Sequence, residues 1–228
     1  MKLRQTQSPR GPGRPAAGLA RDAREQLLTA ATTLFAEQGV AATTFAMIAK
    51  RAGLTPAMLH YYFSDRDALL DAVVAERLAA LIASVWQPVT PGDSPDAMIR
   101  GIVDRLLAGI GRMPWVPSTW MREVLNDGGL LRSRVLRLLP FDSVRTVGSA
   151  IAHGQASRTI NPDLDPSLLV FSILGLVMLH SATAGFWAEI FHRPIPTREA
   201  LARHITGLLL HGLDPVPRSP RNTQRRHK

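Results

Sequence analysis

The sequence predicts an all-α protein with a small N-terminal domain and a larger helical second domain. Apolar residues recur at helical spacing along most of the 228 residues, and proline- or glycine-rich breaks separate these segments. No stretch shows the strict alternation of a half-buried strand. With 46% hydrophobic and 20% charged residues, the chain can bury a core. We therefore expect around ten helices.

The first helix is expected from Arg21 to the residue before Gly39, because five apolar positions follow one helical stripe and the glycine ends it. The stripe consists of Leu27, Leu28, Ala31, Leu34 and Phe35. A fourth helix is expected after Ser64 and Asp65, which have the chemistry of capping residues. Its predicted apolar face contains Leu69, Val73 and Leu81, together with Ala72 and Ala80.

Between these helices, residues 44–63 predict a helix-turn-helix. Thr44 is the expected N-cap of a helix over Phe45–Ala52, and Gly53 lies just past its end. Thr55-Pro56 predicts the start of a second helix that runs to Phe63.

The spacing of this motif assigns an inner and an outer side to its helices. Ile48, Ala49, Leu54, Leu59 and Phe63 are expected to pack the two helices together. Pro56, Ala57, His60 and Tyr61 then face outward, toward a DNA major groove. Periodicity alone leaves the αα-hairpin of an ordinary bundle as the alternative.

Residues 21–81 resemble the DNA-binding domain of the TetR family of transcriptional repressors. The resemblance rests on LLTAATTLFAEQGV, TFAMIAKRAGLTPAMLHYYF and FSDRDALLDAVV. It implies that Thr44 and Arg66 contact phosphates and that the second helix of the motif reads bases. His60 stands where the family usually has tyrosine, so Tyr61 or Tyr62 is expected to take over part of that role. The expected DNA-binding residues are Arg14, Thr44, Lys50, Thr55, Pro56, Ala57, His60, Tyr61, Tyr62 and Arg66.

Basic charge is concentrated at the two ends of the chain. Residues 1–24 carry a net charge of +5 and residues 214–228 carry +4, whereas the remainder is neutral. We expect residues 1–20 and 214–228 to be disordered, either binding DNA or acting as solubilising tails. Gly13-Arg14-Pro15 is similar to the core of an AT-hook, although it also fits an ordinary linker. The first residues contain no apolar leader, so we expect a cytoplasmic protein.

Residues 82–213 form the expected second domain. A linker over 87–95 lies near its start, and six apolar segments follow the linker. The breaks between them lie at 113–117, 128–129, 140, 161–163, 194–196 and Gly212. The resemblance implies that this domain binds a small effector and forms a homodimer through helices near 166–190 and 197–210. Candidate pocket residues are aromatic, methionine and histidine side chains that can equally be core residues. They are Trp115, Trp120, Met121, Phe141, His153, Met178, His180 and Trp187.

The segment from Pro166 to Ala188 contains no charged residue and is long enough to span a membrane. Its polar residues and the absence of paired aromatic belts favour a buried helix at an oligomer interface instead.

No pattern supports a metal, a cofactor or catalysis. The absence of cysteine excludes a thiolate zinc site and a cysteine nucleophile. Glu189 and His192 have di-iron spacing, but only one copy occurs, and Asp165 is better explained as a helix N-cap than as a calcium ligand. The sequence therefore predicts a homodimeric repressor that a small effector releases from a palindromic operator. The alternatives are a helical enzyme or carrier that does not use its DNA-binding-like domain, and a single-span membrane protein.

Overall fold

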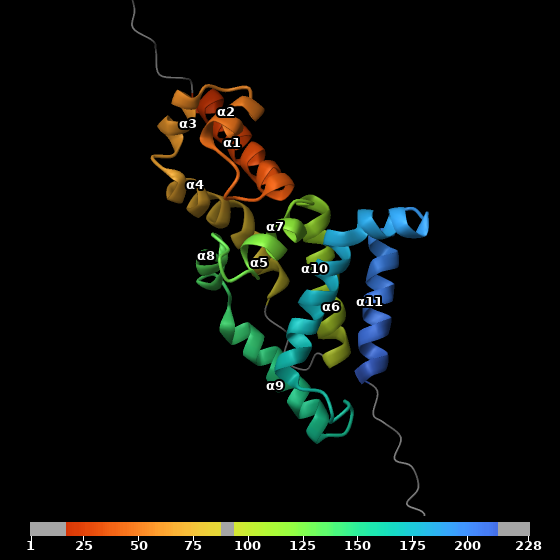
Figure 1. Cartoon of the computed structure of the whole chain (residues 1–228). Coiled ribbons are helices and arrows are strands. Elements are labelled where there is room, and N and C mark those ends of the chain that lie inside the picture. The colour runs from red at the N-terminus through yellow and green to blue at the C-terminus, as the bar shows by residue number, and fades with distance from the viewer. Residues whose placement is uncertain (1–16, 88–93, 214–228) are drawn as a thin grey trace, which may run out of the picture. The chain divides into compact units, whose positions relative to one another are not determined.

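A computed structural model describes residues 17–87 and 94–213, and this part of the chain is helical throughout, without a strand (Figure 1). The all-α prediction is confirmed. Two compact units divide between Val73 and Val74, whereas the sequence placed the domain boundary at residue 81. The helices of the first unit are α1 (Ala17–Gln38), α2 (Phe45–Arg51), α3 (Pro56–Tyr62) and α4 (Arg66–Val73). The second unit contains η1 (Val74–Leu78), α5 (Ala79–Val85), α6 (Pro95–Arg112), α7 (Val116–Glu123), α8 (Arg132–Leu136), α9 (Phe141–Ala156), α10 (Pro166–Phe191) and α11 (Arg198–Leu213).

The first unit is built on α1, which packs against α2, α3 and α4. Its predicted stripe is buried, with Leu27 and Ala31 fully inaccessible to solvent. Gly39 ends the helix in a left-handed conformation with φ of 85°, which only glycine adopts at little cost. The helix begins at Ala17, however. Residues 17–20, which were expected to be disordered, are therefore helical. Residues 1–16 lie outside the described part.

The expected fourth helix is interrupted. Asp65 caps its start, since its Oδ1 accepts a hydrogen bond of 2.8 Å from the amide of Ala68. The α-helical pattern ends at Val73 and is followed by the π-helical turn η1 before α5 begins. Of the predicted apolar face, Leu69, Ala72, Val73 and Leu81 are buried, whereas Ala80 is exposed.

In the second unit α6 occupies the centre and packs against α5, α9, α10 and α11, as Figure 1 shows for α10 and α11 beside it. The six predicted segments correspond to α6–α11. Ser94 caps α6 and Pro95 is its first residue, so the end of the predicted linker already belongs to this helix. Residues 88–93 of that linker and 214–228 of the tail lie outside the described part. Gly212 does not end a segment as expected, because α11 continues to Leu213.

The long apolar helix α10 is only partly covered by its own chain. Asp165 caps it as predicted, accepting hydrogen bonds from the amides of Ser167 and Leu168 at 2.7 and 3.2 Å. Of the described helices, it is the one long and apolar enough to cross a membrane, yet only 28% of its most apolar window is buried. Five of its exposed apolar residues follow one stripe at helical spacing, and Trp187 and Phe191 are exposed beside it; the stripe consists of Leu168, Phe171, Leu179, Phe186 and Ile190. The expectation of burial is therefore not met within a single chain.

Candidate functional site

The turn between α2 and α3 has the geometry that its sequence predicts. Thr44 and Thr55 cap the two helices, each Oγ1 accepting a hydrogen bond of 3.3 Å from the amide three residues later. Gly53 has φ of 68°, and the amide of Leu54 donates to the carbonyl of Ala49 at 2.9 Å. This is the bond pattern of a glycine-terminated helix. Local chemistry therefore fixes the angle between the two helices.

One side of this motif forms the core of the unit. Ile48, Ala49, Leu59 and Phe63 are buried, as their spacing predicts. Leu54 was expected among them but is only half-buried. The guanidinium of Arg24 on α1 lies 5.0 Å from the centre of the Phe63 ring, a cation–π contact that closes the edge of the core.

The outer side of α3 is open to solvent. Pro56, Ala57, His60 and Tyr61 are exposed, and Tyr61 keeps 67% of its surface accessible. These positions lie at i, i+1, i+4 and i+5, so they share one face of the helix. Thr44 and Lys50 on α2 and Thr55 at the start of α3 are exposed as well. The described residues predicted to meet DNA therefore reach solvent, with two exceptions.

The first exception is Tyr62. Its side chain is half-buried, and its hydroxyl is buried without a hydrogen-bond partner in the described structure. The Tyr61 and Tyr62 rings meet edge to face at 5.0 Å, so Tyr62 supports Tyr61 from behind. Of the two tyrosines expected to take over part of the role of the family's tyrosine, only Tyr61 is exposed. His60 is exposed and its ring lies 5.1 Å from that of Phe45 on α2.

The second exception is Arg66, expected to be a phosphate contact. Its side chain is half-buried at the start of α4. Nη1 donates a hydrogen bond of 3.2 Å to the carbonyl of Thr43, and Nη2 donates to the carbonyl of Val40. Both carbonyls belong to the loop that precedes the Thr44 cap. Arg66 therefore binds the loop between α1 and α2, and its guanidinium is engaged inside the protein.

A second contact fixes α2 against α1. Arg51 donates two hydrogen bonds of 2.6 Å to the two carboxylate oxygens of Glu37. The hydrogen bonds from Arg51 hold the pKa of Glu37 below its usual value. Both side chains are solvent-accessible, so the pair fixes geometry more than it adds stability. Arg14, predicted to enter the minor groove, lies outside the described residues.

Comparisons with known proteins point to one family. The model of the bacterial regulatory proteins of the tetR family matches residues 27–73, which span α2, α3 and α4. The HTH-type transcriptional regulator BetI of Stenotrophomonas maltophilia is 40% identical over 82 residues, 36% of this chain and 42% of that protein. UidR of Escherichia coli, also an HTH-type transcriptional regulator, is 22% identical over 83% of this chain and 94% of its own. The first unit is therefore similar to the DNA-binding part of tetR-family transcriptional regulators.

A solved structure extends the similarity to the fold of most of the chain. The ketosteroid transcriptional regulator KstR2 of Mycobacterium tuberculosis superposes with a TM-score of 0.67 at 20% identity, covering 84% of this chain and 94% of that one. The chain thus shares its helical fold with that protein. The BetI match, in contrast, covers less than half of its relative's length.

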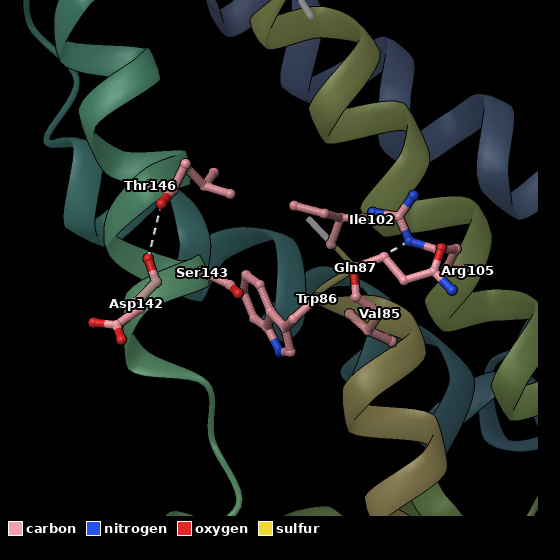
Figure 2. Close-up of a pocket in the computed structure, with 9 residues that line it drawn as sticks. Val85, Trp86, Gln87, Ile102, Arg105, Asp142, Ser143 and Thr146 are labelled. Atoms are coloured by element: carbon pink, nitrogen blue, oxygen red, sulfur yellow. Dashed lines mark hydrogen bonds between the residues drawn. The ribbon is translucent and has the colours of Figure 1, made fainter. Parts of the chain in front are cut away.

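The second unit contains a cavity of about 220 Å³ enclosed by α5, α6 and α9 (Figure 2). Trp86 and Gln87 follow α5, Arg105 comes from α6, and the start of α9 contributes Asp142 and Thr146. The Nε of Arg105 donates to the carbonyl of Val85 at 3.2 Å, which joins α6 to the end of α5. We call this the central cavity. Sequence reasoning missed it, because none of its lining residues is among the predicted pocket residues.

A second hollow, of about 420 Å³, lies where α10 meets the start of α11. We call it the α10–α11 hollow. His180 and Trp187 line it, so two of the eight predicted pocket residues share a cavity. The other six line neither of these cavities. Met178 is buried in the core, whereas Met121, Phe141 and His153 are exposed and Trp115 and Trp120 are half-buried.

Proposed function

We propose that this protein is a homodimeric repressor that binds a palindromic operator through α3 and is released from it by a small molecule. The observation that supports the proposal most strongly is the exposed face of α3, presented by a motif that is capped at both helices. A rigid helix with accessible side chains at its start is what reading a major groove requires. Tyr61 keeps 67% of its surface accessible and is the expected base-reading residue.

Phosphate contacts are assigned to Thr44, Lys50 and Thr55. The two threonine hydroxyls accept their capping bonds and keep a proton to donate to a phosphate oxygen. Lys50 supplies the charge that phosphate binding needs. Arg66 is assigned to the loop rather than to phosphate, because both of its terminal nitrogens donate to carbonyls of Val40 and Thr43.

The experiment is a selection of bound fragments from random double-stranded DNA with the purified full chain. The selected sites should be inverted repeats whose half-site centres lie about 34–36 Å apart, one turn of DNA. Tyr61→Ala should change which bases are selected, whereas Lys50→Ala should weaken all selected sites alike. Selection of sites without inverted symmetry, or none at all, would contradict the proposal.

The dimer interface is assigned to the exposed stripe of α10 and the neighbouring Leu208 of α11. An isologous interface pairs the same apolar surface of two copies and removes it from water. Leu179 is 48% exposed at the middle of the stripe, whereas Leu176 is half-buried within the chain. Leu179→Arg should therefore give monomers by light scattering that lose operator binding.

The matched control is Leu136→Arg on α8, a leucine of similar exposure at 42%. It should leave both the dimer and operator binding unchanged. Dissociation by the control, or a Leu179→Arg variant that stays dimeric, would place the interface elsewhere.

The effector site is assigned to the central cavity. Apolar Val85, Trp86 and Ile102 line it together with polar Arg105, Asp142 and Thr146, which suits a small molecule with both apolar and polar groups. Its volume is below the roughly 300–1,000 Å³ of most ligand pockets. The test is a thermal-shift screen of polar metabolites, followed by operator release. Thr146→Phe, which fills the cavity, should abolish both effects.

A further inference from the structure

We propose that the α10–α11 hollow is a separate binding site for a planar apolar anion, such as an aromatic carboxylate. This inference goes beyond the effector assigned to the central cavity. The two cavities share no lining residue, so each can be tested independently.

The hollow continues the inward face of α10 and not its exposed stripe. Successive residues of an α-helix are turned by about 100°. Leu169, Ile173 and Val177 lie on the inward face and are buried. Ala184 and Phe191 follow in the same direction toward the end of the helix, where Phe191 is 62% exposed. There the packing elements leave about 420 Å³ unfilled.

The stripe and the hollow lie on different faces of α10, and the hollow residue Trp187 is itself 46% exposed. The stripe residue Phe186 and the hollow residue Trp187 are adjacent in sequence and so point in directions about 100° apart. The volume lies within the range of about 300–1,000 Å³ that small-molecule sites occupy. A small ligand is the occupant that these dimensions fit.

The walls favour a flat apolar molecule. The rings of Trp187 and Phe191 are nearly parallel, with an interplanar angle of 18° and centroids 5.5 Å apart. Ala184 and Ala188 are too small to occupy the space beside these rings. An aromatic ligand can stack on such a surface, and stacking is worth about 0.5–1.5 kcal/mol beyond burial in measured aromatic pairs.

The opposite side of the hollow is formed by the connection to α11. His192 adopts a left-handed conformation with φ of 51° and ends α10, so that the amide of Arg193 donates to the carbonyl of Ala188 at 3.0 Å. Pro194 and Pro196 follow and also line the hollow, with their backbone φ fixed by the ring. The rim is thus shaped by backbone constraints rather than by long side chains.

The charge of the hollow selects an anion. Arg193 is the one charged residue in its lining, and its guanidinium makes no ion pair within the described residues. His180 is hydrogen-bonded through Nδ1 to the carbonyl of Leu176 at 2.7 Å, and its ring lies 5.7 Å from that of His204, so the ring is fixed at the side of the hollow. A carboxylate on a flat ring system would meet the guanidinium at the rim while the ring stacks on Trp187.

The experiment measures binding of 2-naphthoate to the full chain by calorimetry, with uncharged 2-naphthamide as the comparison ligand. One 2-naphthoate should bind per chain. Arg193→Gln should weaken 2-naphthoate about fivefold, as expected for one solvent-accessible ion pair, and leave 2-naphthamide unchanged. Arg137→Gln, a change of an exposed arginine on the surface beyond α8, should alter neither ligand.

Two further variants locate the ligand. Trp187→Phe should retain the binding heat but lose most of the ligand-induced change in tryptophan fluorescence. Thr146→Phe, which fills the central cavity, should leave 2-naphthoate binding unchanged.

Four results would overturn the proposal: no saturable heat, equal affinity for the two ligands, weaker binding in Thr146→Phe, or a monomeric Trp187→Ala variant. A monomeric Trp187→Ala variant would show that the hollow belongs to the subunit interface. Operator binding enters none of these measurements, so their failure leaves the proposed function standing.

Discussion

Replacing Arg66 with methionine removes both guanidinium hydrogen bonds to the α1–α2 loop while keeping an unbranched apolar stem. A hydrogen bond from a charged donor contributes about 1.5–3 kcal/mol when its partner is shielded from water. Arg66 is half-buried, and the carbonyl of Val40 keeps a second bond from the amide of Thr43 at 3.1 Å. Water therefore replaces part of the loss, and we expect a total of about 2 kcal/mol. For a chain of this length that lowers the melting temperature by about 4–8 °C.

The effect on DNA binding separates the two roles that Arg66 can have. A residue that positions the loop weakens operator binding at every salt concentration equally, because no phosphate contact is lost. A phosphate contact instead reduces the slope of log affinity against log salt by about 0.9. We expect Arg66→Met to leave this slope unchanged while affinity and melting temperature both fall.

Lys50→Met is the matched control, since Lys50 is an exposed cation on α2. It should reduce the salt slope by about 0.9 and leave the melting temperature unchanged. Affinity is measured by fluorescence anisotropy at five potassium chloride concentrations, and stability by calorimetry. If Arg66→Met instead behaves as Lys50→Met does, the guanidinium binds phosphate in the complex and the loop assignment is wrong.

Two further predictions concern the cap of α4 and the arm. Hydrogen bonds from the Ala68 amide and the Ser64 hydroxyl lower the pKa of Asp65 below its usual value. The carboxylate of Asp65 therefore contributes to stability above its unfolded-state pKa, and this contribution is lost as the pH falls through the lowered folded-state pKa. Asp65→Asn should therefore show less loss of stability in urea unfolding between pH 5 and pH 2. Deleting residues 1–16 should weaken binding more on A·T-rich than on G·C-rich operator flanks and leave melting unchanged, since α1 is retained. An equal loss of affinity on both flanks would mean that residues 1–16 contribute only nonspecific electrostatic attraction to DNA.

The helix-turn-helix could be predicted because its determinants are local. The caps at Thr44 and Thr55 and the left-handed Gly53 each depend on residues within one helical turn. The role of Arg66 could not be predicted in the same way, because its acceptors lie 23 and 26 residues earlier in the chain. Hydrophobic periodicity contains no information on a hydrogen bond between such distant residues. The family resemblance instead implied that Arg66 contacts phosphate.

The cavities were missed for a different reason. Aromatic and methionine residues were chosen as pocket candidates by type, yet type does not distinguish a side chain in the core from one beside empty space. Met178 is buried in the core, whereas Ala184 lines a hollow because its side chain is small. The composition of α10 predicted burial correctly in one respect only, since its inward residues are covered and its outward stripe is not.

The π-helical turn at Val74–Leu78 changes how this part of the chain responds to insertions and deletions. A π turn accommodates one more residue than the α-helical turn it replaces, so the flanking helices keep their rotational phase despite the additional residue. Removing a residue from an ordinary α-helix instead rotates everything beyond it by about 100°. A variant lacking the exposed Ala75 is therefore expected to have one uninterrupted α-helix from Arg66 to Val85 with the same faces buried. A one-residue deletion here is therefore expected to convert the π-helical turn into an α-helical one without rotating the helix that follows.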